Sequence, residues 1–113
     1  MFSERLQIRT TVTSRGITVV TPAGEVDHTG APALEEVLTA SGRLPCAVVD
    51  FSHTAFIDSS GITALLRANR SLRAAGGWLR LSSIPEGPLR VMRIVGLDHV
   101  IDVYPTLHAA LRT

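Results

Sequence analysis

Residues 46–62, CAVVDFSHTAFIDSSGI, decide the fold of this chain. The run from Cys46 to Phe51 is almost wholly apolar, which is typical of a strand that is buried on both faces of a parallel sheet. A helical pattern of apolar residues begins at Ile62, directly after Asp58-Ser59-Ser60-Gly61, whose residue types suit the start of a helix. The stretch therefore predicts a buried strand that leads into a helix with two serines in its first turn.

Strand and helix patterns alternate along the rest of the chain. Further strands are expected at residues 6–12, 17–21, 78–82 and 100–103, and helices at residues 59–75, 85–95 and 105–111 and from Pro32 to a stop at residues 41–43. The turn residues 14–16 make a hairpin of the first two strands, and a bend with one more short strand is expected at residues 22–27. This order predicts a single α/β domain, residues 1–113, built on one mixed sheet.

The apolar spacing also predicts which faces of the helices are buried. The expected inner faces are Ile62, Leu65, Leu66, Asn69 and Leu72 in one helix and Leu89, Met92 and Val95 in the next. Arg67 and Arg70 are expected on the solvent side of the first of these two helices. Pro32 suits the first position of its helix, so Ala31 before it is expected outside the helix.

The composition excludes several classes of protein. Apolar residues make up 45 % of the 113 residues, which excludes a disordered chain, and a formal charge of +1 gives no strong attraction to nucleic acid. All basic residues are arginine, so the lysine of a P-loop is absent. No apolar run reaches the ~18 residues of a membrane span, and the charged N-terminus does not resemble a signal peptide. We therefore expect a cytoplasmic protein with no membrane or nucleic-acid partner.

Cysteine and histidine offer little chemistry. Cys46 is the only cysteine, so an internal disulfide is excluded, and a buried structural thiol is expected rather than a reactive one. None of the four histidines has zinc-type spacing to another ligand, and we expect no metal and no cofactor. His53 lies near Ser59 in the sequence, which suggests a hydrolase that uses a Ser/His pair. The sequence, however, has no G-x-S-x-G nucleophile elbow and no clear third group to orient the histidine. We therefore expect no enzyme activity.

The segment Asp58-Ser59-Ser60-Gly61 has two interpretations from its residues alone. These residues are good N-caps, and helix chemistry by itself favours this structural role. The free N–H groups and the positive dipole at a helix start also favour an anion, so a phosphate added to a serine hydroxyl would be held there.

Motifs of a known family occur in two segments of the chain. The first is Gly24-Glu25-Val26-Asp27-His28, and the second is Val48-Val49-Asp50-Phe51 followed by Phe56-Ile57-Asp58-Ser59-Ser60-Gly61-Ile62. The likeness extends through Gly76-Gly77 and Ile94-Val95-Gly96-Leu97. With these motifs, residues 8–111 resemble the anti-sigma factor antagonists, which are built on the STAS domain (sulfate transporter and anti-sigma factor antagonist). The resemblance implies a STAS-like mixed sheet of four to five strands, with about four helices packed mainly on one side.

The resemblance also implies a phosphorylation switch. In bacterial members the serine directly after the motif aspartate is phosphorylated, and here that residue is Ser59, with Ser60 as the alternative. The kinase is the anti-sigma factor, a protein with a GHKL-type ATP-binding domain. The unmodified antagonist binds this anti-sigma factor and frees the sigma factor for transcription, whereas the phosphorylated antagonist lets go. A PP2C-type phosphatase resets the cycle.

The residues expected to face the partner surround this serine. They are Asp27, His28, Asp58, Ser59, Ser60, Gly61 and Ile62. Structural roles stay open for several residues: Asp27 and His28 as turn residues, and Ile57 and Ile62 as core residues. The same family includes STAS domains without a switch, so the alternative function is an interaction or ligand-sensing domain of a lipid-transport or stressosome-type complex.

Overall fold

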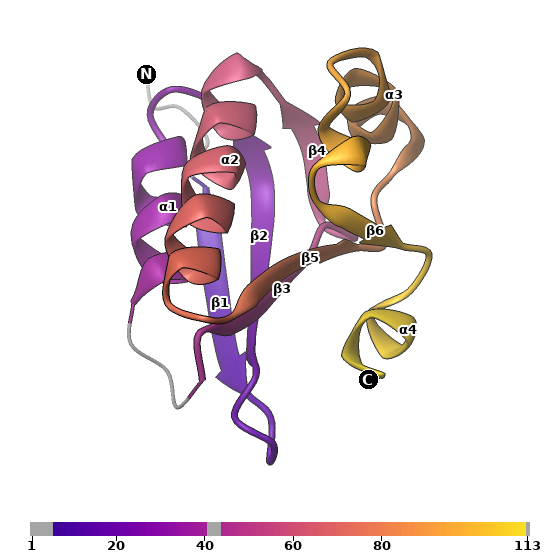
Figure 1. Cartoon of the computed structure of the whole chain (residues 1–113). Helices are drawn as coiled ribbons and strands as arrows, with labels where there is room; N and C mark the ends of the chain where they lie inside the picture. Colours follow the sequence, from indigo (N-terminus) through magenta and orange to yellow (C-terminus); the bar gives the residue numbers. More distant parts are fainter. Residues whose placement is uncertain (1–5, 41–43, 113) are drawn as a thin grey trace.

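The computed structural model of the chain describes residues 6–40 and 44–112. The elements follow one another as β1 (Gln7–Val12), β2 (Thr18–Val26), α1 (Ala31–Thr39), β3 (Cys46–Asp50), β4 (Thr54–Ile57), α2 (Ser59–Ala74), β5 (Trp78–Ser82), α3 (Glu86–Ile94), the 3-10 turn η1 (Leu97–His99), β6 (Asp102–Tyr104) and α4 (Leu107–Leu111) (Figure 1). The expected α/β organisation is confirmed.

The sheet is mixed, with the strand order β1-β2-β3-β5-β6. β1 and β2 form an antiparallel hairpin, and β3, β5 and β6 add to β2 as parallel neighbours. β4 lies off this path and pairs with the second half of β2, so the sheet has one strand more than the four to five expected. β4 escaped prediction because it has only four residues and follows β3 after residues 51–53.

β2 does not bend away at residues 22–27, as the sequence suggested, but continues as a strand to Val26. Gly24 has a positive φ of 118°, which a glycine adopts without strain, and the pairing register shifts between Gly24 and Glu25. β2 pairs with β3 through residues 18–20 and with β4 through residues 24–26, so it changes its partner just before this irregularity. Val26 therefore lies opposite Ile57, and the segments that lead into α1 and α2 end side by side.

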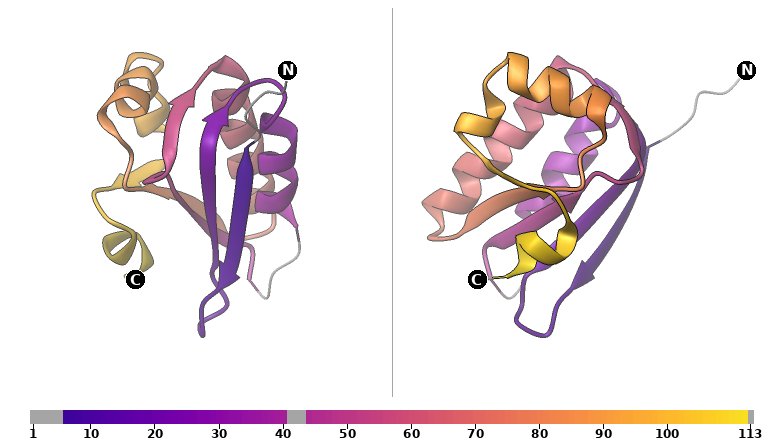
Figure 2. Two further views of the ribbon diagram at one scale, coloured as in Figure 1. Left: turned by 180° about the vertical axis from the view of Figure 1, so that it is seen from behind. Right: turned by 90° about the vertical axis from the view of Figure 1, so that its right-hand side faces the viewer.

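Three of the helices share one core with the sheet. Their apolar side chains pack in one cluster with those of the strands, for example Leu34 of α1, Leu65 of α2 and Met92 of α3. α4 packs on the other face, where Ala110 meets Ile17 and Val48 (Figures 1 and 2). The half-buried Cys46 lies in this second cluster, as expected of a structural thiol.

The predicted inner faces of the helices hold with two exceptions. Ile62, Leu65, Asn69 and Leu72 of α2 are buried. Leu66, however, is 36 % exposed, whereas Ala64 and Ala68, which were not predicted, are buried on the inner face. In α3 Met92 is buried and Leu89 half-buried, whereas Val95 is 56 % exposed because the helix ends at Ile94.

Several element boundaries also differ from the prediction, and α4, for example, begins at Leu107 rather than at Pro105. Ala31 lies inside α1, because the Asp27 carbonyl accepts the N–H groups of Gly30 and Ala31 (3.1 and 2.8 Å) and sets the first turn before the proline. The last strand begins at Asp102 rather than Val100, because residues 97–99 form η1 and its Leu97 carbonyl accepts the N–H of Val100. The helix stop at residues 41–43 lies outside the described residues.

Candidate functional site

α2 begins at the serine motif because Asp58 caps it. The backbone of Asp58 is extended, and its Oδ1 accepts the N–H groups of Ser60 (2.8 Å) and Gly61 (3.3 Å). The Asp58 N–H in turn donates to the Val26 carbonyl (3.1 Å), which ties the cap to the end of β2. The carboxylate therefore satisfies two of the donors at the positive end of the helix.

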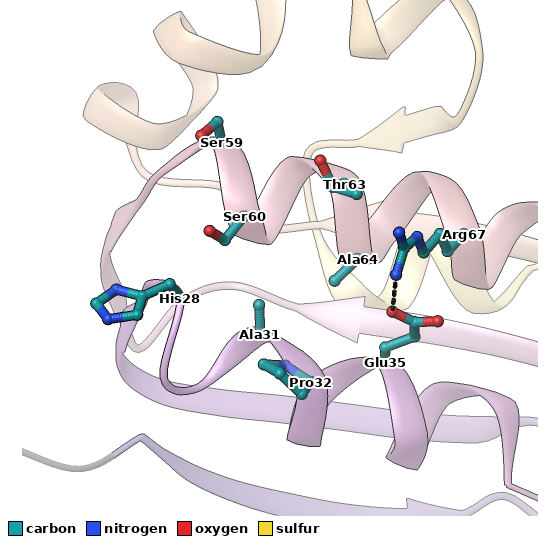
Figure 3. A pocket seen from close by; sticks show the side chains of 9 residues that line it. All are labelled: His28, Ala31, Pro32, Glu35, Ser59, Ser60, Thr63, Ala64 and Arg67. Carbon is teal, nitrogen blue, oxygen red and sulfur yellow. Dashed lines mark ion pairs between the residues drawn. The ribbon is translucent and has the colours of Figure 1, made fainter.

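Ser59 is exposed at the first position of α2 (Figure 3). Since Asp58 already holds the N–H groups of Ser60 and Gly61, a phosphate on Ser59 does not find these donors free, contrary to the sequence-based expectation. The phosphate would instead stand beside a carboxylate on the surface. Ser60 is half-buried and lies on the side of α2 that faces α1 (Figure 3).

Gly61 is required at its place by close packing. A Cβ atom there would lie 2.5 Å from Cγ1 of Ile57 and 2.8 Å from Cγ1 of Val26. Both neighbours are fully buried side chains of β4 and β2 that have little room to move. The motif glycine thus lets the start of α2 sit directly on the ends of these two strands, which gives Gly61 a packing role whether or not a partner contacts it.

A groove of about 350 Å³ lies between α1 and α2, next to the capped helix start (Figure 3). Its lining consists of His28, Ala31, Pro32, Glu35, Ser59, Ser60, Thr63, Ala64 and Arg67. The structure therefore brings His28 of the first motif together with Ser59 and Ser60 of the second. Sequence reasoning placed these residues near one partner surface and missed Glu35 and Thr63.

The far end of this groove is closed by an ion pair between the two helices. Arg67 Nη1 of α2 lies 4.0 Å from Glu35 Oε1 of α1, and the Arg67 side chain is 65 % exposed (Figure 3). The four-residue spacing of Ser59, Thr63 and Arg67 puts them on one face of a helix, and this signal could have found the α2 wall of the groove. The sequence held no signal that α1 forms the opposite wall.

Asp27 has a structural role at the start of α1. Its Oδ1 accepts the hydroxyl of Thr29 (2.7 Å), the N–H of Thr29 (3.0 Å) and the N–H of Gly30 (3.2 Å). The hydrogen bonds from Thr29, then that from Gly30 and the nearby charge of His28, hold the pKa of the Asp27 carboxyl below its usual value. Asp27 thus fixes the turn, and its neighbour His28 is exposed on the groove.

The two isoleucines beside the motif belong to the core. Ile57 is 2 % exposed and Ile62 is 8 % exposed, and both pack in the main cluster. The core role that was left open for Ile57 and Ile62 is therefore confirmed, and a partner contact by Ile62 stays a prediction.

The structure does not bring His53 and Ser59 together. The four residues of β4 lie between them and span about 13 Å at about 3.3 Å per residue. The His53 ring instead meets the Ser52 hydroxyl, with 3.1 Å between Nδ1 and Oγ. The idea of a Ser/His nucleophile pair is therefore wrong.

Residues 6–40 and 44–112 contain neither a metal-binding cluster nor a helix suited to a membrane. Within this part of the chain no three His, Cys, Asp or Glu side chains gather closely enough to hold a metal ion. None of the helices found there has the length and apolar character needed to cross a membrane.

Comparisons with known proteins agree on one family. The STAS domain matches residues 9–110. The anti-sigma-F factor antagonist RsfB of Mycobacterium tuberculosis is 28 % identical over 100 residues, which cover 85 % of this chain and 80 % of that protein. The anti-sigma-B factor antagonist of Bacillus subtilis is 28 % identical over 82 residues, which cover 72 % and 75 %.

A solved structure shares this fold. The crystal structure of an anti-sigma factor antagonist from Mycobacterium paratuberculosis superposes with a TM-score of 0.81 at 30 % identity, and the match covers 94 % of this chain and 91 % of that chain. The resemblance seen in the sequence is thereby confirmed, and the chain belongs to the STAS domain family.

Proposed function

We propose that this protein is an anti-sigma factor antagonist that binds its anti-sigma factor when Ser59 is unmodified and lets go when Ser59 is phosphorylated. The names of the similar proteins from two bacterial genera support the first part of this proposal. The observation that carries the second part is the exposed Ser59 hydroxyl at the start of α2, beside the groove between α1 and α2. A charge added there alters the surface without moving an element of the fold.

The electrostatics of this surface favour a switch that acts on the partner. Phosphorylation adds a charge of about −1.5 to −2 next to the Asp58 carboxylate, whose capping hydrogen bonds stay in place. A partner surface shaped for a neutral hydroxyl then meets repulsion and a buried charge without a counterion. Loss of several kcal/mol of binding free energy, on the order of 100-fold in affinity, follows from such a change.

The exposed lining of the groove provides the remainder of the proposed contact surface. His28, Thr63 and Arg67 are exposed and flank the two serines, so a partner that covers Ser59 also covers these side chains. Asp58 contributes its negative charge at the rim. In this proposal the anti-sigma factor is also the kinase, with a GHKL-type ATP-binding domain.

The protein itself acts as a substrate in the cytoplasm and not as an enzyme. The Ser59 oxygen forms a bond to the γ-phosphorus of ATP while the bond to ADP breaks, and the hydroxyl proton is released. A PP2C-type phosphatase later hydrolyses the phosphate ester and restores the binding form.

A titration with the cognate anti-sigma factor tests the charge mechanism. Ser59→Asp is expected to weaken binding on the order of 100-fold relative to the unmodified chain. Ser71→Asp is the matched control, because it adds the same charge to an exposed serine of the same helix, about 18 Å away at 1.5 Å per residue. If both substitutions weaken binding to the anti-sigma factor equally, the loss of affinity comes from net charge alone, and the proposed role of Ser59 is contradicted.

The alternative is a STAS domain that binds its partner without a switch. It is favoured by the cap at Asp58, which accounts for the motif without phosphorylation. The same titration separates the two functions, since the alternative predicts equal affinity for the wild type and Ser59→Asp.

A further inference from the structure

A second groove of about 300 Å³ lies on the β1–β2 hairpin, apart from the serine site. It is lined by Gln7, Ile8, Arg9, Thr21, Ala23 and His53. Gln7 lies opposite Ala23, and Arg9 lies opposite Thr21 in the antiparallel register, so these four side chains share one face of the hairpin. Since Ile8 on the other face packs against the main core, the groove faces away from α1 and α2.

This face of the hairpin is open. Seen from behind, β1 and β2 lie in front of α1 and α2, and no helix of the described residues crosses in front of them (Figure 2). The side chains of Gln7 and Arg9 form no hydrogen bond or ion pair with any residue of the described part of the chain. The donors of the groove are therefore available to a ligand.

The side chain of His53 is held at the edge of the groove by a chain of hydrogen bonds. Asp50 Oδ1 accepts the N–H of Ser52 (3.0 Å), and the Ser52 hydroxyl lies 3.1 Å from His53 Nδ1, while His53 Nε2 has no hydrogen-bond partner among the described residues. The His53 carbonyl accepts the N–H of Gly24 (3.0 Å), and the buried Thr54 hydroxyl donates to the Pro22 carbonyl (2.9 Å). These bonds fasten the β3–β4 turn to β2, so this wall of the groove is formed before any ligand arrives.

The geometry points to a binding site for a small organic anion that carries a phosphate or carboxylate group. The guanidinium of Arg9 presents a planar fork of donors that matches either group, and the Gln7 amide and the Thr21 hydroxyl add neutral donors. The lining contains no Asp or Glu that would repel an anion, and Ala23 offers apolar surface to the carbon part.

The size of the groove limits the ligand. Its volume is at the lower end of the roughly 300–1,000 Å³ found for small-molecule sites, so it suits a molecule of few heavy atoms rather than a peptide or a lipid chain. None of its lining residues belongs to the groove at Ser59, so the inference goes beyond the proposed function and does not depend on it.

The test is a titration of the ¹⁵N-labelled full chain, followed by NMR, with inorganic phosphate, glycerol phosphate and succinate as separate probes. We expect saturable shifts of the amide signals at residues 7–9, 21–23 and 53 with at least one probe. A response to the two phosphates alone assigns a phosphate ligand, and a response to succinate assigns a carboxylate ligand. The absence of saturable shifts at these residues up to about 10 mM of every probe overturns the inference.

Two arginine variants make the result specific. Arg9→Gln removes the guanidinium group from an exposed position of the edge strand β1, and we expect the anion probe to bind at least about tenfold more weakly. Arg73→Gln removes the same charge from the exposed end of α2 and is expected to bind like the wild type. Equal affinity of Arg9→Gln and the wild type, or equal weakening by both variants, contradicts the site. The spectra themselves show whether each variant is folded.

Discussion

Ser59 and Asp58 are adjacent residues with separate tasks. The Asp58 carboxylate accepts two N–H groups of α2, whereas the Ser59 hydroxyl is exposed and takes no part in the cap. Substitution of Ser59 therefore leaves the helix start intact, and an effect of Ser59→Ala on phosphorylation or binding can be assigned to the hydroxyl. The sequence alone did not separate these tasks, because both residue types occur as helix caps.

Gly61 provides a prediction about stability. In Gly61→Ala the new methyl group meets the buried Ile57 and Val26 side chains, and we expect the free energy of unfolding to fall by about 1–3 kcal/mol. Urea unfolding followed by circular dichroism measures this change.

Gly87→Ala in α3 is the matched control for that measurement. Nothing lies within 4 Å of the Cβ that would be added there. Since alanine is the better helix former, the free energy of unfolding is expected to stay the same or rise by up to about 1 kcal/mol. A Gly61→Ala protein as stable as the wild type would show that the strand ends yield to the methyl group.

The start of α1 depends on an ionised Asp27. Because three hydrogen bonds lower the pKa of this carboxyl below its unfolded value, its contribution to stability is present at neutral pH and disappears as the pH falls through the lowered pKa, below about 4. Asp27→Asn keeps an acceptor oxygen but does not titrate. We expect its free energy of unfolding to fall less steeply below pH 4 than that of the wild type.

Urea unfolding over a series of acidic pH values tests this element. Asp98→Asn, at an exposed carboxyl of η1, is the control and should follow the wild-type curve. If Asp27→Asn and the wild type lose stability in parallel as the pH falls, the hydrogen bonds at the start of α1 do not stabilise the ionised carboxyl.

The elements that the sequence predicted best are those with strong local signals. β5 has the predicted bounds, since Gly76-Gly77 ends α2 before it and its own residues are apolar in alternation. β4 is too short to show a period, and it pairs with the part of β2 that lies beyond the residues paired with β3. β2 changes from one neighbouring strand to another because of contacts between segments that are distant in the sequence. A local sequence pattern therefore does not predict this change.

At the scale of the whole molecule, Arg80 fastens the C-terminal helix to the sheet. Its Nη1 donates to the carbonyls of Ala110 (3.0 Å) and Arg112 (3.3 Å), and its guanidinium carbon lies 3.8 Å from the centre of the Trp78 ring. α4 has only five residues, too few for a helix that is stable by itself. The helix therefore depends on these contacts and on the small cluster beneath it.

Hydrogen exchange measured by mass spectrometry tests this attachment. Arg80→Met keeps an apolar stem but loses both donors, and we expect exchange at residues 106–112 to become at least about tenfold faster while the other elements stay protected. Arg73→Met, at an exposed position of α2, is the control and should leave this segment unchanged. Unchanged exchange in Arg80→Met would mean that the apolar cluster alone holds α4.

The candidate site is also a property of the whole molecule. The motif serine and its neighbours were identified from the sequence, because the family resemblance depends on contiguous residues. The wall of the groove that Pro32 and Glu35 form was not identified from the sequence, because it depends on α1 lying beside α2. The sequence therefore located the candidate serine but not the shape of the surface around it.

The most direct measurement of the central claim is phosphopeptide mapping after incubation of the purified protein with its cognate anti-sigma factor and Mg-ATP. The proposal predicts phosphate on Ser59 alone, no labelling of Ser59→Ala, and normal labelling of the neighbouring Ser60→Ala. Labelling of Ser59→Ala to the wild-type level, or phosphate found only on Ser60, would contradict it.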